Sequence, residues 1–374
     1  MSAPTGSLAP TRRTHDAKEF AAELASQQAS SERRLRVLLG AGASRSAGLP
    51  DLAGLSRGVL ARTKPDFGKM VEGLFHGRNL EQALTRLRRI ASLLDAGETF
   101  AELGVTDAQA LEKAMTEAIV QEILAVSTSS NPYDGLATWV VHQERRNPVE
   151  VFTLNYDTLF ETALEDVAGA YFDGFVGVLE GAFRPDLVDG DPSQAPLPAF
   201  IARVWKLHGS INWKVDRTAA VPRIIRLGQP VVGEVAAIYP SEEKYEASRR
   251  VPFLVLHDRF RRAMAEPESL LLVAGYSFGD QHLNEVIYNA ALRNPRSPII
   301  VFCHKTIPDA LADRASTLVN LTVVSETEAI WSGRRAPWAG GDVAEVLEAG
   351  KLVLSDFPRL SMFMARGIDA RNVL

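Results

Sequence analysis

Four short polar segments, each lying directly after an apolar run, carry the residue types that could do chemistry in this chain. They are the segments 40–44 (GAGAS), 155–157 (NYD), 208–210 (HGS) and 275–280 (GYSFGD). In open α/β sheets, ligands bind beyond the carboxyl ends of the strands. If the four apolar runs are strands of one sheet, the sequence predicts that these segments converge on a single polar site.

The glycine turn has two interpretations when it is taken alone. Glycines after a strand let the backbone approach a diphosphate, and the N-terminus of the following helix favours its negative charge. However, the dehydrogenase fingerprint G-x-G-x-x-G requires glycine where Arg45 stands, and the turn lacks the lysine of a P-loop. A nucleotide-binding turn and a plain strand-to-helix turn at Gly40 and Gly42 are therefore equally good interpretations.

The other polar residues also have structural alternatives. Asp157 follows a strand and is well placed to cap the next helix, and Ser277 and Asp280 are typical turn and cap residues. His208 is either a core histidine or a functional one, and its position between an apolar strand and Gly209 favours function. Three further residues are expected to lie outside the site. His282 is expected to be structural or peripheral, Trp213 to pack, and Cys303 to be inert at the end of a buried strand.

Apolar runs and helical periodicity indicate the elements that would position these segments. Strands are expected over 35–39, 148–154, 202–207, 235–239, 270–274, 298–302 and 321–324, and helices over 15–34, 157–167, 253–264, 280–292 and 342–350. Residues 53–148 are predicted to be almost wholly helical, and residues 170–200 irregular. The alternation of strands and helices predicts an α/β fold with a Rossmann-like, open and mostly parallel sheet.

Length and composition restrict the class of protein. The chain has 374 residues, 46% hydrophobic and 23% charged, with a formal net charge of −5. These values are ordinary for a globular protein, and the mild acidity argues against a dedicated nucleic-acid binder. No run approaches the roughly 20 apolar residues of a membrane helix, and residues 1–14 form an expected mobile tail without the apolar core of a secretory signal. The single cysteine excludes an internal disulfide and a cysteine zinc cluster.

Taken together, the four segments resemble the motifs of a known family. The run GAGASRSAGLPD (40–51) is similar to the NAD-binding signature of sirtuins. The runs TLNYD (153–157), KLHGS (206–210) and GYSFGD (275–280) resemble later motifs of the sirtuin-like branch of bacterial anti-phage defence. That branch includes the Thoeris NADase effector and the sirtuin-like partners of HerA-type ATPases. The resemblance divides the chain into an N-terminal tail and helix (1–33), a catalytic domain (34–325, with a helical insertion at 53–148) and a C-terminal extension (326–374).

The resemblance implies a role for each matching residue. Those that would cradle the NAD diphosphate are Gly40, Ala41, Gly42 and Ser44. Those that would contact the two riboses are Pro50 and Asp51, in the loop covering the nicotinamide ribose, and Gly275 and Ser277, at the adenosine ribose. Those that would be catalytic are Asn155 and Asp157, flanking the nicotinamide pocket, and His208.

The chain also departs from sirtuin deacylases. Their zinc ribbon needs four cysteines, and the helical segment 53–148 stands where that zinc lobe would pack. No groove for an acyl-lysine peptide is recognisable, so water becomes the expected acceptor and no metal is expected. The resemblance therefore implies an NAD+ glycohydrolase, with NAD+ as its substrate. The alternatives are ADP-ribosyl transfer from the same site and a catalytically silent module that binds NAD or ADP-ribose.

The resemblance carries expectations about partners as well. An NAD-depleting defence enzyme must stay inactive until it is triggered, because unregulated loss of NAD kills the cell. The chain has no room for a complete second sensor domain. A homo-oligomer and a separately encoded partner such as a HerA-like ATPase are therefore expected to control it, in the cytoplasm and without membrane or direct nucleic-acid contacts.

Overall fold

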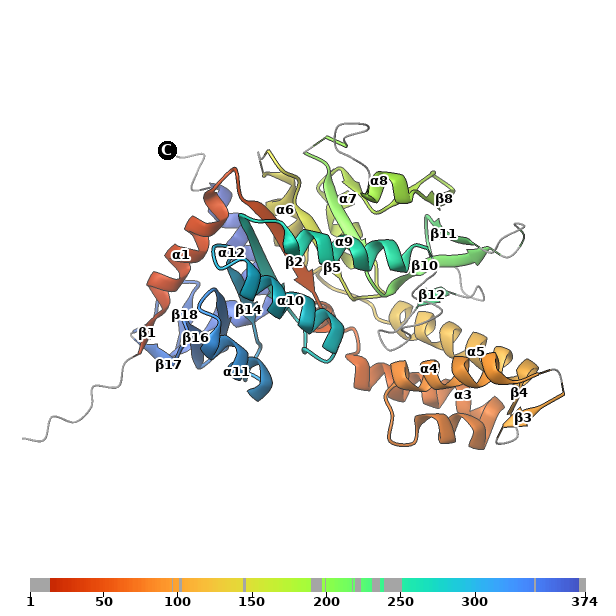
Figure 1. Cartoon of the computed structure of the whole chain (residues 1–374). Helices are drawn as coiled ribbons and strands as arrows, with labels where there is room; N and C mark the ends of the chain where they lie inside the picture. The colour runs from red at the N-terminus through yellow and green to blue at the C-terminus, as the bar shows by residue number, and fades with distance from the viewer. Residues whose placement is uncertain are drawn as a thin grey trace, which may run out of the picture.

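The structure is a computed structural model that gives the chain a large central sheet, a second sheet and a helical lobe (Figure 1). It describes residues 14–95, 97–100, 103–143, 146–189, 197–198, 200–216, 218, 223–230, 236–238, 251–339 and 341–369. The expected tail at residues 1–14 lies, apart from its last residue, outside the described residues.

The central sheet has the strand order β1-β17-β16-β15-β14-β13-β2-β5-β9-β6 within the described chain. Its neighbours from β15 to β6 all pair in parallel, whereas β16 pairs antiparallel with both β15 and β17. The predicted open, mostly parallel α/β sheet is therefore confirmed. The strands are β1 (His15–Asp16), β2 (Arg34–Leu39), β5 (Glu150–Thr153), β6 (Tyr171–Phe172), β9 (Ala202–Lys206), β13 (Ser269–Ala274), β14 (Ile299–Phe302), β15 (Leu321–Val324), β16 (Glu328–Trp331) and β17 (Arg334–Ala339).

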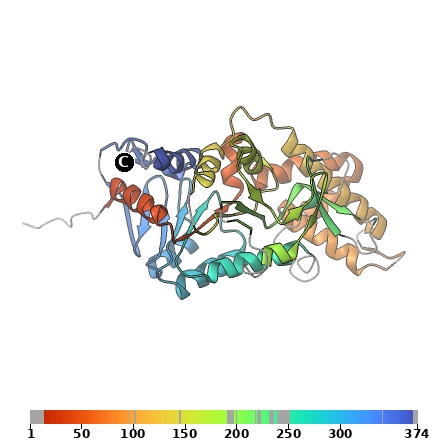
Figure 2. The same cartoon turned by 90° about the horizontal axis from the view of Figure 1, so that it is seen from above.

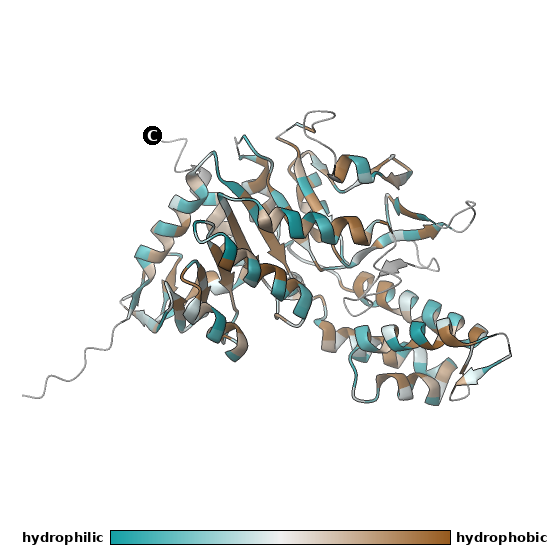
Figure 3. Ribbon diagram, viewed as in Figure 1, coloured by the Kyte–Doolittle hydropathy of each residue, from teal (hydrophilic) through white to brown (hydrophobic). Residues whose placement is uncertain are grey.

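Helices cover both faces of this sheet because successive strand residues point to opposite sides. On β2, Leu35, Val37 and Leu39 join one apolar core, while Leu38 joins the other. The first core receives α1 (Ala17–Ala29), α6 (Asp134–Val141), α7 (Leu159–Asp166) and α12 (Phe357–Asp369). The second receives α9 (Phe253–Ala265), α10 (Gln281–Arg293) and α11 (Asp309–Thr317). Figure 3 shows the central strands as a mainly hydrophobic layer between these helices.

A second sheet corrects the expectation that residues 170–200 are irregular. Short strands β7 (Phe175–Val176) and β8 (Glu180–Phe183) pair through β8 with β11 (Arg223–Leu227). Strand β11 in turn pairs with β10 (Gly209–Asp216), which begins directly after His208, and β10 also pairs with β12 (Ala236–Ile238). A short helix, α8 (Pro185–Asp189), follows β8. Residues 190–196 and 199 lie outside the described residues, as do the two ends of the strand predicted over 235–239.

Most of the segment predicted to be helical (53–148) forms a separate lobe after the glycine turn, whereas its last helix, α6, packs on the central sheet. Three helices pack on a core of their own: α3 (Leu52–Phe75), α4 (Leu80–Leu93) and α5 (Val105–Leu124), joined in part by a hairpin of β3 (Thr99–Phe100) and β4 (Leu103–Gly104). The start of α4 is fixed by a capping box between Asn79 and Gln82. Seen from above, this lobe and the C-terminal elements lie at opposite ends of the molecule (Figure 2).

The helix predicted over 342–350 is wrong. Glu345, Ala349 and Gly350 all adopt positive φ, which a right-handed helix excludes. The segment instead forms a small hairpin of β18 (Leu347–Glu348) and β19 (Lys351–Leu352), followed by the short turn η2 (Val353–Ser355). The helix of this region is α12, which packs on α6; the amide of Leu136 donates to Ser361 Oγ at 2.7 Å.

Candidate functional site

The four polar segments lie at the ends of four consecutive strands. Strands β13, β2, β5 and β9 are neighbours in that order, and all run in parallel. Their carboxyl ends therefore meet along one edge of the sheet, as the sequence predicts. Thr153 pairs with Lys206 in register, so Asn155 and His208 each lie two residues beyond paired positions on adjacent strands.

The glycine turn packs against the segment that follows β13. The turn continues into α2 (Ala41–Ser44) and η1 (Arg45–Ala47). A Cβ on Gly40 would lie 2.5 Å from the Gly275 carbonyl oxygen, and a Cβ on Gly42 would lie 2.8 Å from Gly275 Cα. The Gly42 amide donates to the Gly275 carbonyl at 2.9 Å. The glycines thus have a packing reason of their own, and the proposed contact with a diphosphate stays a prediction.

Asn155 is held by one end of its amide. Its Nδ2 lies 3.1 Å from the Gly40 carbonyl oxygen, 3.0 Å from Ser44 Oγ and 3.0 Å from Tyr133 Oη. The side chain is buried, and its Oδ1 has no hydrogen-bond partner among the described residues. The amide is therefore fixed in orientation, with an acceptor left over.

Asp157 supports this arrangement through both carboxylate oxygens. Its Oδ2 accepts from Ser44 Oγ at 2.8 Å, and its Oδ1 accepts from the Leu159 amide at 3.1 Å, at the start of α7. Burial raises the pKa of Asp157, against the opposing charge of Lys206. Both the expected cap contact and a contact to the glycine turn are present, although Thr158 is the N-cap residue itself. Asp157 thereby ties Ser44, and through it Asn155, to α7.

His208 lies at the junction of the two sheets. Gly209, with φ of +89°, turns the chain from β9 into β10, and that left-handed conformation favours glycine. The His208 side chain is buried, and its Nε2 makes no hydrogen bond to any described residue. The nearest charged group recorded for Nε2 is Asp280 Oδ2, at 3.7 Å. Both adjacent strand ends, at Asn155 and His208, thus present a buried polar atom that makes no hydrogen bond within the described part of the chain.

The remaining predicted residues lie in the segments that follow β2 and β13. Asp51 is the N-cap of α3 and accepts from the Gly54 amide at 2.8 Å, next to the half-buried Pro50. Ala41 and Ser277 are exposed at the ends of β2 and β13. Of the residues expected to lie outside the site, His282 is exposed, whereas Trp213 and Cys303 are buried.

Two buried residues of the site, Tyr133 and Lys206, were not predicted from the sequence. Tyr133, at the start of α6, bonds to both Ser44 and Asn155, and burial raises its pKa well above the usual value. Lys206, two residues before His208, pairs with Glu161 at 2.9 Å and donates to the Asp157 carbonyl. A lysine inside an otherwise apolar strand is a signal for the second residue. Tyr133 has no comparable local signal.

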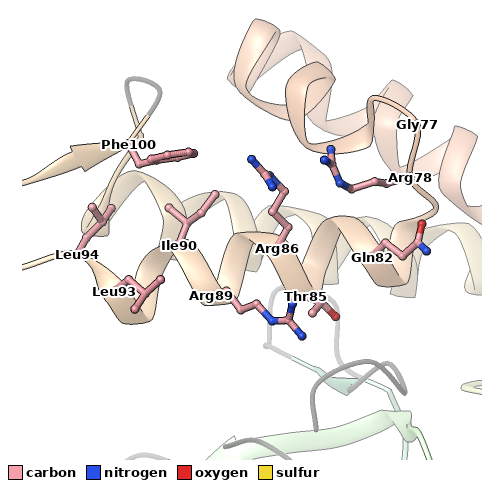
Figure 4. Close-up of a pocket in the computed structure, with 10 residues that line it drawn as sticks. All are labelled: Gly77, Arg78, Gln82, Thr85, Arg86, Arg89, Ile90, Leu93, Leu94 and Phe100. Atoms are coloured by element: carbon pink, nitrogen blue, oxygen red, sulfur yellow. The ribbon is translucent and has the colours of Figure 1, made fainter. Parts of the chain in front are cut away.

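A groove of about 510 Å³ lies elsewhere, on the helical lobe (Figure 4). It is lined by three arginines, apolar side chains and a few small or polar residues: Arg78, Arg86, Arg89, Ile90, Leu93, Leu94, Phe100, Gly77, Gln82 and Thr85. None of the predicted site residues lines it. Arg78 bonds to carbonyls at the end of α3, and Arg86 lies over the Phe100 ring, so two of these arginines already have partners inside the lobe.

Among the described residues, no cluster of three or more His, Cys, Asp or Glu side chains is arranged to hold a metal ion. No helix in the same part of the chain is both long and apolar enough to cross a bilayer.

Comparison with known proteins finds a family similarity over the part of the chain that carries three of the four polar segments. A search of curated proteins found no match to the chain. A solved structure described as "Structural Basis for the Mechanism and Regulation of Sir2 Enzymes" aligns with 97% of this chain and 100% of its own, with a TM-score of 0.45 and 13% identity. Residues 149–319, less than half of the chain, match the sequence model of the family described as "SIR2-like domain". The central segment, which carries Asn155, Asp157, His208 and the 275–280 segment, is therefore similar to SIR2-like domains.

Proposed function

We propose that this protein hydrolyses NAD+ to nicotinamide and ADP-ribose, and that it acts in the cytoplasm as an NAD-depleting effector of bacterial anti-phage defence. The observation that carries the proposal is the fixed, buried amide of Asn155, whose Oδ1 has no partner among the described residues, beside His208 in the SIR2-like segment. An unsatisfied buried acceptor costs about 1–3 kcal/mol. A ligand hydroxyl or a water bound there would satisfy it.

Hydrolysis of NAD+ does not require a general acid in the site. Nicotinamide leaves NAD+ as a neutral molecule from a cationic pyridinium, so no general acid has to protonate it. The site must stabilise a ribose with oxocarbenium character and deliver water to it. Asn155 Oδ1 would accept a hydrogen bond from that water or from a ribose hydroxyl, and His208 would take the proton of the water as general base.

The other residues orient the catalytic groups and the bound NAD+. Both carboxylate oxygens of Asp157 are engaged with Ser44 and Leu159, so its role is to hold the glycine turn and Asn155 in place. Ala41, Gly42 and Ser277 are exposed in the segments that follow β2 and β13, where the diphosphate and the adenosine ribose would lie. Control by homo-oligomerisation or by a HerA-like ATPase belongs to the same proposal and is supported by the family resemblance. Full activity of a strictly monomeric protein would count against control by assembly.

Product analysis tests the reaction. The purified protein is incubated with NAD+, and nicotinamide and ADP-ribose are followed by chromatography. We expect both products, and a loss on the order of 10²–10³ in rate for Asn155→Ala and for His208→Ala. His282→Ala, which removes an exposed histidine at the start of α10, serves as the matched control.

Each alternative predicts a different product pattern. Full activity of both site variants, with native folding, would contradict the assignment. ADP-ribose recovered on a protein or small-molecule acceptor would favour group transfer. NAD+ binding without turnover would favour a silent binding module.

A further inference from the structure

The environment of His208 extends beyond the strand ends to two helices on one face of the sheet. Helix α9 contributes His257, whose ring lies 6.1 Å from that of His208 between centroids, with planes 23° apart. The start of α10 contributes Asp280, whose Oδ2 lies 3.7 Å from His208 Nε2. Catalytic hydrogen bonds are often long in ligand-free sites and tighten in the complex. Asp280 Oδ2 is thus placed to become the partner that Nε2 lacks.

The position of Asp280 is set by the helix that it begins. Its Oδ1 accepts from the amides of His282 at 2.9 Å and Leu283 at 3.3 Å, which caps α10. Tyr276 Oη donates to the Asp280 carbonyl at 3.0 Å and to Asn284 Oδ1 at 2.8 Å, which ties the preceding loop to the same helix. One carboxylate oxygen therefore caps the helix while the other faces His208.

The charges around His208 leave Asp280 as its counter-ion. Burial opposes ionisation of Asp280, but the His208 ring and the Leu283 amide hold the pKa of Asp280 below its usual range. Burial, and then the charge of His208, lower the pKa of His257 to about 4, so His257 is neutral at neutral pH. Tyr276 is neutral because burial raises its pKa. Lys206, on the strand side, is paired with Glu161.

We propose that Asp280 is a positioning residue for His208, whose Nε2 proton it accepts so that Nδ1 becomes the basic nitrogen of the ring. The inference rests on the proposed function, in which His208 activates water. In that step the water oxygen bonds to the ribose carbon, the glycosidic electron pair leaves with nicotinamide, and the water proton moves to Nδ1. The imidazolium so formed lies beside the ionised Asp280, with the neutral ring of His257 on another side.

Asp280→Asn separates this role from helix capping. Asparagine caps a helix as well as aspartate does, but its amide group donates to Nε2 and favours the opposite tautomer. We expect kcat to fall about 10²-fold with little change in KM. The acid limb of the pH–rate profile should move to lower pH, because the imidazolium loses its carboxylate. Glu285→Gln, which removes an exposed carboxylate from the same helix, is the charge-matched control.

Nitrogen-15 NMR of the histidine rings in the protein without NAD+ reads the tautomer directly. We expect the Nε2–H form of His208 in the wild type and a shift toward Nδ1–H in Asp280→Asn, with the His208 signals identified by their loss in His208→Gln. An unchanged tautomer together with an unchanged pH profile would overturn the proposal and leave Asp280 as a cap alone. If the wild-type protein turned over no NAD+, the proposed function would fail, whereas the tautomer would still support or overturn the placement of Asp280.

Discussion

Two buried polar clusters lie at opposite ends of the same strands, and they differ in how completely their hydrogen bonds are made. Glu150 begins β5 at the amino end of the sheet, and Asn155 follows β5 at the carboxyl end. At about 3.3 Å per residue, the two side chains are separated by only some 16 Å along one chain segment. The comparison shows what a purely structural polar cluster in this fold looks like beside the candidate site.

The carboxylate of Glu150 is fully engaged by neighbouring side chains, although Arg36 Nη1 in the same cluster is also buried without a hydrogen-bond partner among the described residues. Glu150 Oε1 accepts from Trp205 Nε1 at 3.0 Å and from Arg259 Nε at 2.8 Å, and its Oε2 accepts from Arg259 Nη2 at 2.7 Å and from Arg36 Nε at 3.4 Å. Burial would raise the pKa of Glu150, but the bonds and charge of Arg259 and the charge of Arg36 hold it below the usual value. Both oxygens are used, so the carboxylate needs no ligand.

At the carboxyl end of the strands, some polar atoms of the candidate site have hydrogen-bond partners and others do not. Nδ2 of Asn155 has three neighbours to bond with, and Asp157 uses both carboxylate oxygens. Asn155 Oδ1 and His208 Nε2, however, make no hydrogen bond to any described residue, and the carboxylate facing Nε2, that of Asp280, lies 3.7 Å away. Buried polar atoms in native proteins are nearly always paired, and the exceptions need a reason. The same strands thus contribute stability at their amino ends and keep hydrogen-bonding capacity free at their carboxyl ends.

Breaking the cluster around Glu150 should have the largest effect on stability. Glu150→Gln removes the buried carboxylate that Arg36 and Arg259 share and leaves them only the partly exposed Glu266. Removing one partner of a buried ion pair costs about 3–5 kcal/mol, and because Glu266 remains we expect a loss near the lower end of that range. Urea unfolding would measure this loss. The variant should still bind NAD+ with native affinity where it remains folded, because the cluster lies at the end of the sheet away from the site.

The control for that prediction is a surface ion pair on the same sheet. Glu328→Gln breaks the exposed pair with Arg335 and should cost only about 0–1 kcal/mol.

The contribution of Glu150 to stability should depend on pH with a definite sign. Because the pKa of Glu150 is lower in the folded state, its contribution is complete above the unfolded value of about 4.3 and is lost as the pH falls through the folded value. Equal losses in the two variants, or the same acid dependence in Glu150→Gln as in the wild type, would remove the distinction between the clusters.

A substitution at Gly275, which packs against the glycine turn, should have the second largest effect on stability. In Gly275→Ala, the added Cβ would lie 2.2 Å from the Ala43 amide nitrogen, at a residue with φ of +67°. We expect a loss of about 1–3 kcal/mol from overpacking, together with a fall in NAD+ affinity as the glycine turn is displaced. Gly279→Ala, in the same loop, meets only Ser277 Oγ at 3.5 Å and should stay within about 0.5 kcal/mol of the wild type. A stable Gly275→Ala protein would show that the turn can move without cost.

The carboxyl ends of the four central strands could be predicted from the sequence better than the elements around them. Apolar runs followed by polar segments identified β2, β5, β9 and β13, and the rule for parallel sheets joined their ends before any geometry was known. The sheet of β10 and β11 was not predicted, although Ile211, Trp213 and Val215 alternate with polar residues as in a half-buried strand. Which strands pair with β10 depends on tertiary contacts that this local pattern does not give. The region 342–350 has a helix-forming composition, but positive φ at Glu345 and Ala349, imposed by the hairpin, overrides it.

The supporting residues were harder to predict for a related reason. Asp280 has the sequence signature of a helix cap, and it is one; the direction of its second oxygen depends on where β9 ends in space. Tyr133 lies 22 residues before Asn155, and its ring is held by packing against Phe357, 5.1 Å away between centroids, near the other end of the chain. Neither contact follows from local spacing, because both depend on tertiary packing.

Removing the Tyr133 hydroxyl should have the smallest effect on stability. It would test how firmly the Asn155 amide is oriented. Tyr133→Phe deletes the contacts to Ser44 Oγ at 2.7 Å and Asn155 Nδ2 at 3.0 Å but keeps the buried ring. We expect a loss of about 1 kcal/mol in unfolding free energy and, because Asn155 is less firmly oriented, a fall of roughly tenfold in kcat, equivalent to about 1.4 kcal/mol. KM should change little. Tyr171→Phe, which removes an exposed hydrogen bond to Glu165, is the matched control. If the two variants behaved alike in kcat, Gly40 and Ser44 alone would hold the Asn155 amide, and Tyr133 would belong with the packing residues rather than with the site.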